Sequence, residues 1–276
     1  MLSYLKHWNL SSPLTGQRDD GGIFLPAERE QSLTRLLQIL THDNVLITIP
    51  AAAGMGKSTL LGWLKSHLPF PEHEVFSGVL IREETTAGWL SKRLVQHLRG
   101  EQASASSAEE VKDALREALQ LMDEFKLQQT RLVILIDNAE RIKGDAYSEL
   151  LGFFDLADTA GVPFSCVLAG DPAMGQQLNQ HPALARRIRL QMELPPYTNE
   201  EAVGYIKWHL DRAGLQQNLI SREVMLQMAK AAYGLPSRMH NLLENTLLEA
   251  AQAKEKIITL EHVSAADRLL APIGEP

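Results

Sequence analysis

The chain has 276 residues, of which 45% are hydrophobic and 22% are charged, values typical of a folded protein with one large or two modest domains. The formal net charge of −7 argues against a surface that coats nucleic acid. The single cysteine, Cys166, excludes a disulfide framework or a cysteine-based metal site.

Residues 1–26 contain scattered aromatic side chains and read as an irregular leader with one short helix. They lack the basic region, apolar core and cleavage site of a secretory signal. No apolar run approaches the roughly 18 residues that cross a bilayer. We therefore expect a cytoplasmic protein, peripheral to the inner membrane only if a partner recruits it.

Apolar runs and helical periodicities alternate from residue 27 to residue 195. Strands are predicted at 45–49, 75–81, 131–137, 164–170 and 190–194, and helices from 26 and at 89–98, 111–125 and 147–160. Residues 100–108 (GEQASASSA) read as a solvated loop within this region. The alternation predicts an α/β domain with a parallel sheet covered by helices on both faces.

Beyond Pro195 the pattern becomes helical throughout. Thr198 begins a capping box, Ser221 caps a second helix, Pro236 opens a third and Thr259 a fourth. We therefore predict three parts: a leader (1–26), an α/β domain (27–195) and a small all-helical domain (196–276).

The segment 47–61, ITIPAAAGMGKSTLL, is the strongest functional motif. Small residues between a strand and a helix let backbone N–H groups approach phosphate oxygens, as in a phosphate-binding loop. Lys57 would contact the β- and γ-phosphates of ATP, and the Ser58 hydroxyl would bind Mg²⁺. The predicted nucleotide-binding residues of the loop are Ala53, Gly54, Met55, Gly56, Lys57, Ser58 and Thr59. An ordinary strand–turn–helix is the alternative, and Ala51 stands where such loops usually begin with Gly.

Asp137 ends the apolar run RLVILID and is the predicted second magnesium ligand, because nucleotides bind at the carboxyl ends of parallel strands. In many such ATPases a glutamate follows this aspartate, whereas here Asn138 follows, which can orient water but cannot take its proton. Glu140 is the candidate base. It is alternatively a surface residue that pairs with Arg141 or Lys143. Slow hydrolysis is the expected consequence.

Three further charged residues are candidates for the catalytic site. Asp171 follows the strand 164–170 and either senses the γ-phosphate or caps the next helix. An arginine of the segment HPALARRIRL, Arg186, Arg187 or Arg189, either acts on the nucleotide of a neighbouring subunit or belongs to a solvated basic face. Arg238 either couples the helical domain to the γ-phosphate or is a surface arginine.

With these residues in place, the chain resembles AAA+ ATPases of the ExeA-like (GspA-type) secretion and pilus-biogenesis group, which are related to transposition ATPases of the TnsC, TniB and MuB kind. The leader is similar to the family's aromatic opening, and residues 170–184 to its segment GQPEL…L…P.L. Arg187-Ile188 matches the family's RI pair. The stretch 234–238, GLPSR, resembles the family's second sensor, GxPRRIN. Asp171 replaces a Gln of the family, and Ser237 replaces the first sensor arginine.

The resemblance implies a P-loop NTPase fold of the AAA+ type with a helical lid. It implies that Phe24 and Leu25 contact the adenine, that Arg187 is an arginine finger acting in trans, and that Arg238 is a sensor. It also implies ATP and Mg²⁺ as cofactors and a homo-oligomeric ring or filament. Three functions remain open: an ATPase that assembles or positions a secretion, pilus or envelope machine, a DNA-bound transposition regulator, and a slowly hydrolysing nucleotide switch.

Overall fold

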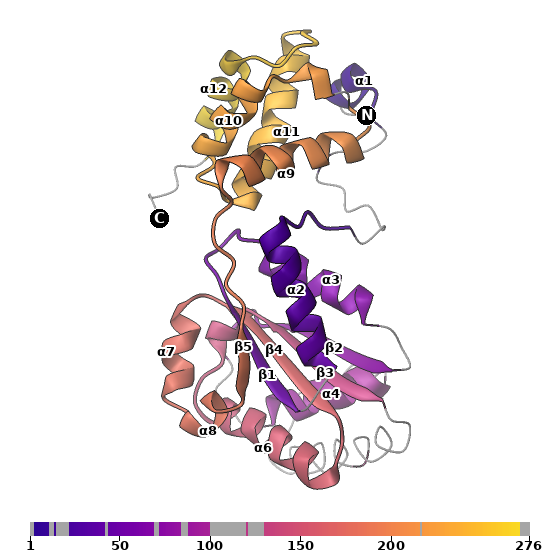
Figure 1. Ribbon diagram of the computed structural model, residues 1–276, viewed down its shortest axis with the longest axis vertical. Coiled ribbons are helices and arrows are strands. Elements are labelled where there is room, and N and C mark those ends of the chain that lie inside the picture. The colour runs from indigo at the N-terminus through magenta and orange to yellow at the C-terminus, as the bar shows by residue number, and fades with distance from the viewer. Residues whose placement is uncertain are drawn as a thin grey trace. The chain divides into compact units, whose positions relative to one another are not determined.

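The computed structural model (Figure 1) describes residues 3–10, 14, 22–41, 44–68, 72–83, 88–99, 120, 130–215 and 217–270. Contacts divide the chain into two units. The sheet unit comprises Ala27–Ala53 and Lys57–Leu194, and the helical unit comprises Met1–Pro26, Gly54–Gly56 and Pro195–Pro276. The predicted loop 100–108 lies outside the described residues, and so does the predicted helix 111–125 apart from residue 120.

Five parallel strands form the sheet, as the alternation of apolar segments predicts. The strands are β1 (Val45–Pro50), β2 (His73–Val79), β3 (Arg131–Asp137), β4 (Phe164–Gly170) and β5 (Ile188–Gln191). Their order is β2-β3-β4-β1-β5, so β4 lies between β3 and β1. The last strand begins two residues before the predicted 190–194, because it pairs with β1 from Leu46 to Thr48.

Helices cover both faces of this sheet. They are α2 (Ala27–Leu40), α3 (Lys57–His67), α4 (Trp89–Arg99), α6 (Asp145–Ala160), α7 (Ala173–Asn179) and α8 (Pro182–Ala185), with a 3-10 turn, η1 (Ala139–Arg141). Helices α2 and α3 contact the strands on one face. Helices α4, α6 and α8 share one apolar cluster with alternate residues of β3 and β4, on the other face.

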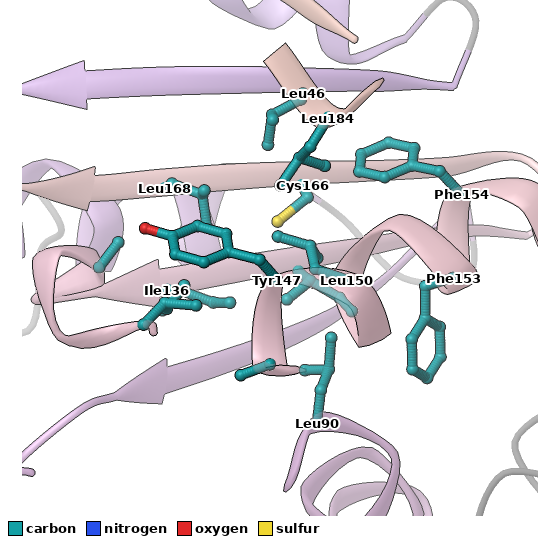
Figure 2. Packing of buried hydrophobic residues seen from close by; sticks show 14 of the residues in the cluster. Leu46, Leu90, Ile136, Tyr147, Leu150, Phe153, Phe154, Cys166, Leu168 and Leu184 are labelled. Carbon is teal, nitrogen blue, oxygen red and sulfur yellow. The ribbon is translucent and has the colours of Figure 1, made fainter. Parts of the chain in front are cut away.

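Helix α6 contributes many residues to the apolar cluster that it shares with α4, α8, β3 and β4 (Figure 2). Its residues Tyr147, Leu150, Phe153 and Phe154 belong to this cluster, together with Cys166 of β4, which is completely buried. Burial raises the pKa of the Cys166 thiol, so that this cysteine is a neutral core residue. The three central strands, β1, β3 and β4, are almost entirely buried, and the candidate site lies at the carboxyl ends of the strands.

The helical unit contains the predicted C-terminal helices. They are α9 (Asn199–Arg212), α10 (Arg222–Ala231), α11 (Pro236–Gln252) and α12 (Leu260–Leu269), with a 3-10 turn, η2 (Gln217–Leu219). The capping box at Thr198 is formed, Ser221 accepts from the amide of Val224, and Thr259 begins a second capping box. In the part of the chain that the structure describes, no helix has the length and apolar content to span a membrane.

The leader begins with α1 (Ser3–Trp8), which packs within the helical unit. The Tyr4 hydroxyl donates to Glu244 at 2.9 Å, and the indole of Trp8 donates to the carbonyl of Leu247 at 2.8 Å. By its contacts the leader therefore groups with the C-terminal helices instead of forming a separate part.

Candidate functional site

Four strands of the sheet end beside one another at its carboxyl edge. Asp137 of β3 is paired with Val79 of β2 on one side and with Ala169 of β4 on the other. The amide of Ala51, which follows β1, donates to the carbonyl of Gly170 at 2.9 Å. The phosphate loop after β1 and the acidic residues after β3 and β4 therefore emerge at the same edge, where ligands bind in open parallel sheets.

The phosphate loop has the backbone that its glycines permit. Gly54 and Gly56 have φ angles of 80° and 90°, a left-handed conformation that side chains disfavour. Ala51 is not among the described residues with positive φ, so an alanine is accommodated at this first position. The Lys57 ammonium donates to the carbonyls of Ala51 and Ala52, at 2.7 and 3.0 Å. It thus lies over the loop whose amides would contact phosphate.

The Ser58 hydroxyl donates a hydrogen bond to the Asp137 carboxylate. Asp137 is only 5% exposed, and its second carboxylate oxygen accepts from the amide of Asn138 at 2.9 Å. A hydroxyl beside a carboxylate fits Mg²⁺, which prefers oxygen ligands and takes most of them from phosphate and water. Among the described residues there is no cluster of three or more His, Cys, Asp or Glu that could hold a metal alone.

The side chain and the backbone of Asn138 both have defined roles in the turn after β3. Its Nδ2 atom donates to the carbonyl of Leu80, just beyond β2, at 3.0 Å. Its backbone is left-handed, with φ 56° and ψ 40°. The side-chain amide is therefore engaged by the neighbouring strand end.

Glu140 lies in η1 and reaches across to the end of β4. Its carboxylate accepts from the amide of Asp171 at 3.0 Å. A Cβ on Gly170 would lie 2.7 Å from this carboxylate and 3.0 Å from the backbone nitrogen of Glu140, so the absence of a side chain at Gly170 leaves room for the contact. The Glu140–Arg141 ion pair is long, at 3.9 Å. Burial and the negative charge of Glu140 raise the pKa of Tyr147 to about 12. Glu140 is thus brought to the carboxyl edge.

Asp171 uses its side chain within its own turn. One carboxylate oxygen accepts from the amide of Ala173 at 2.9 Å, at the start of α7. This contact engages one carboxylate oxygen in the turn that leads into α7, and both roles considered for Asp171 stay predictions.

Arg187 lies at the opposite edge of the sheet, where β5 begins. Its guanidinium pairs with Asp155 at 2.7 Å and Asp158 at 2.5 Å, both on α6, and lies 5.3 Å from the centroid of the Phe154 ring. Burial alone would raise the pKa of Asp158, but hydrogen bonds from Asn44 and Arg187 and the charge of Arg187 lower it. The Arg187 guanidinium is therefore engaged in ion pairs with residues of its own chain, whereas the side chains of Arg186 and Arg189 are exposed.

The remaining predicted residues belong to the helical unit. Arg238 is 8% exposed and is bonded to Asp267 at 2.8 Å and to the carbonyl of Ala231 at 3.0 Å. Phe24 packs edge-on against Tyr197 and Tyr205, with ring centroids 5.7 Å apart, and Leu25 beside it is half-buried. The sensor role of Arg238 and the adenine contacts of Phe24 and Leu25 stay predictions.

Sequence reasoning did not find the partners that hold these residues. Nothing in the linear pattern pointed to the carbonyl of Leu80 as the acceptor for Asn138. The spacing of Asp155 and Asp158, three residues apart on one helix face, was the available signal for an arginine site.

A family comparison agrees with this geometry. The sequence model of a protein family described as "AAA domain" matches residues 40–178 of this chain. The matched region includes the phosphate loop, Asp137 and Glu140. The chain belongs to the AAA domain family. Membership of this family implies nucleotide binding and ATPase activity, with ATP and Mg²⁺ as the expected ligands.

The predicted resemblance to the ExeA-like group is also confirmed. The chain is similar to general secretion pathway protein A of Aeromonas hydrophila, with 24% identity over 131 residues. The matched region covers 46% of this chain and 24% of that relative, so the similarity extends over only about a quarter of the relative's length.

Solved structures share the fold of this AAA family member. Cdc6p of Pyrobaculum aerophilum superposes with a TM-score of 0.69 and 18% identity, covering 98% of this chain and 72% of that one. ORC2 of Aeropyrum pernix in its ADP form has a TM-score of 0.67 and 15% identity, covering 91% and 71%. The RuvB Holliday junction branch migration motor of Thermotoga maritima has a TM-score of 0.58 and 19% identity, covering 93% and 73%. The predicted P-loop AAA+ architecture is confirmed.

Proposed function

We propose that this chain binds ATP with Mg²⁺ at the carboxyl edge of its sheet and hydrolyses it to assemble or position a protein machine of the secretion, pilus or envelope type. The observation that carries this proposal is the hydrogen bond from Ser58 to Asp137. It brings together the hydroxyl and the carboxylate of two motifs 79 residues apart in the chain.

Lys57 and the loop amides would hold the phosphates in this proposal. The carbonyls that now accept from the Lys57 ammonium keep it over the loop, from where it can turn to a phosphate oxygen. The amino end of α3 adds its positive dipole. Ser58 and Asp137 would hold Mg²⁺, which neutralises charge on the phosphates.

Glu140 is the residue that we propose takes the proton of the attacking water. It is the carboxylate of η1 that contacts the end of β4, and that strand neighbours β1 and its phosphate loop. Asn138, which directly follows Asp137, has a side-chain amide that cannot accept a proton at neutral pH. A base displaced by two residues supports slow hydrolysis, so that the bound nucleotide would persist and favour the assembled state.

We propose that hydrolysis involves an arginine from a neighbouring copy. The segment 186–189 begins β5, and the amide of Leu46, near the start of β1, donates to the carbonyl of Arg187 at 3.0 Å. The phosphate loop follows the other end of β1, roughly 16 Å away for five extended residues. This separation from the chain's own phosphate loop supports action of an arginine of the segment on another subunit's nucleotide. Arg187 remains our assignment from the RI match, and Arg186 and Arg189 are the exposed alternatives.

The match to general secretion pathway protein A supports a protein machine as the client. DNA is the competing partner, because one structure that shares the fold is Drosophila ORC bound to DNA, at 14% identity and a TM-score of 0.69. The net charge of −7 favours the protein client, since binding to duplex DNA needs clustered Lys and Arg.

The test is to measure the ATPase rate and the assembly state of the purified chain with ATP, with and without duplex DNA, over a salt series. We expect ATP-dependent oligomers and a rate that DNA does not change. Stimulation by DNA that falls steeply with salt would instead support the transposition regulator. ATP binding without turnover would support the nucleotide switch.

A further inference from the structure

Asn138 adopts a backbone conformation that few residues tolerate. Its φ of 56° and ψ of 40° place it in the left-handed region, directly after the predicted magnesium ligand Asp137. Asparagine and glycine enter this region most easily, whereas a glutamate is disfavoured there by contact of its Cβ with the backbone. The turn after β3 therefore favours asparagine over the glutamate that usually follows the aspartate.

Asn138 also joins the ends of two strands. Its backbone amide donates to a carboxylate oxygen of Asp137 at 2.9 Å, and its side-chain Nδ2 donates to the carbonyl of Leu80 at 3.0 Å. The amide of Leu80 in turn donates to the carbonyl of Asp137 at 3.1 Å. The three residues thus form a closed set of hydrogen bonds, which we call the Asn138 clasp.

Two further contacts extend along the same segment. Arg141 donates to the carbonyl of Ile81 at 3.0 Å, and Lys143 forms an ion pair with Glu83. The segments that follow β3 and β2 are therefore joined by contacts at several positions. These contacts use the backbone of Ile81, whose side chain is 80% exposed. Hydrogen-bond partners around a ligand carboxylate orient it.

We infer that Asn138 is a positioning residue, which holds the Asp137 carboxylate in the direction of Ser58 by clasping the backbone of Leu80, and is not a substitute for the water-activating glutamate. This inference rests on the proposed function, since Asp137 is taken as the magnesium ligand. It is consistent with our proposal that Glu140 is the base, since Glu140 lies two residues after Asn138 and contacts the end of β4.

Three variants separate the positioning role from its alternatives. Asn138→Gly keeps the left-handed backbone and removes the side-chain donor. Asn138→Asp keeps the shape and places an acceptor against the Leu80 carbonyl. Asn138→Glu restores the usual acid of such ATPases. Asn241→Asp, at an exposed position of α11, is the matched control.

The first measurement is hydrogen exchange without nucleotide. In the Gly and Asp variants, we expect amides in a peptide covering residues 75–83 to exchange about tenfold faster, as for the loss of one hydrogen bond to a backbone carbonyl. A peptide covering β4 should be unchanged, and so should the whole control variant. Unchanged exchange of residues 75–83 in both variants would overturn the inference.

The second measurement is ATP affinity with and without Mg²⁺. We expect the Gly and Asp variants to lose about fivefold to tenfold of the affinity measured with Mg²⁺ and to keep the affinity measured without it. Equal losses in both conditions would indicate a general structural role and contradict positioning.

Hydrolysis by Asn138→Glu should be no faster than that of the wild type, and a tenfold acceleration would overturn the inference. Failure of the wild type to bind ATP would reject the proposed function, whereas the exchange result tests the clasp independently.

Discussion

The hydroxyl of Ser58 donates to the buried carboxylate of Asp137, and this bond joins the phosphate loop to the end of β3. Both groups are oxygen ligands of the kind that Mg²⁺ prefers. The contact is therefore the structural core of our account of the nucleotide site.

Asp137→Ala should remove most of the magnesium dependence of nucleotide binding. A charged ligand contributes about 1.5–3 kcal/mol, which corresponds to a roughly tenfold to hundredfold loss of affinity in the presence of Mg²⁺. Titrations of ATP with and without Mg²⁺ check this expectation. An affinity that keeps its full response to Mg²⁺ would place the metal ligand elsewhere.

Glu140→Gln should slow hydrolysis while ATP binding is retained. Glutamine keeps an oxygen that can accept from the amide of Asp171, so the turn is preserved, but it cannot take a proton. We expect a decrease of about 10²–10⁴-fold in the single-turnover rate, the usual contribution of a general base. Glu30→Gln, on the exposed side of α2, is the control. An unchanged rate would mean that another group activates the water.

Arg187→Ala should have two separable effects. Loss of its ion pairs with Asp155 and Asp158 should lower the free energy of unfolding by about 1 kcal/mol, because these carboxylates are partly exposed. If Arg187 acts in trans, its absence should also lower the ATPase rate of the assembled protein. Arg186→Ala and Arg189→Ala should leave stability unchanged, and their ATPase rates show whether one of them carries the trans role instead.

Mixed assemblies test whether the arginine acts between subunits. Lys57→Ala subunits cannot use their own nucleotide but still offer Arg187, and Arg187→Ala subunits offer the opposite combination. We expect a mixture of the two to recover activity that neither has alone. A mixture as inactive as its components would argue against action in trans.

His209 makes the helical unit sensitive to acid. Burial, and then the charges of His240 and Arg212, lower the pKa of His209 to about 3, against about 6.5 in an unfolded chain. Between these values the unfolded state binds more protons, so the free energy of unfolding falls as the pH falls, by up to about 1.4 kcal/mol per pH unit. Urea unfolding at pH 7 and pH 5 should show this loss. His209→Gln should reduce the loss, whereas the exposed His67→Gln should not.

Much of the secondary structure was predictable from local sequence patterns. Thr198 and Ser221 cap helices because their hydroxyls satisfy backbone amides within three residues, a relationship visible in the sequence. The strand 131–137 is likewise visible in the sequence, because its residues 132–136 form an uninterrupted apolar run. The strand order could not be predicted, because pairing of β4 between β1 and β3 is set by contacts distant in the chain.

The candidate site was predictable in its residue types but less so in its contacts. The phosphate loop and Asp137 have fixed spacing and residue chemistry, so the sequence identifies them. Asn138 and Arg187 differ, because their partners, the carbonyl of Leu80 and two aspartates of α6, are brought close only by the sheet and its helices. Every residue has a backbone carbonyl, so the sequence does not reveal which carbonyl accepts a given hydrogen bond.

The most direct measurement is calorimetric titration of ATP with Mg²⁺ into the wild type, Lys57→Ala and Lys65→Ala. Lys65 lies exposed in the last turn of the same helix, so its variant controls for loss of a positive charge. We predict that the wild type and Lys65→Ala bind ATP alike and that Lys57→Ala binds at least about tenfold more weakly, as for loss of a charge-assisted contact to phosphate. Equal affinity of Lys57→Ala and the wild type would contradict the phosphate-loop assignment on which the account rests.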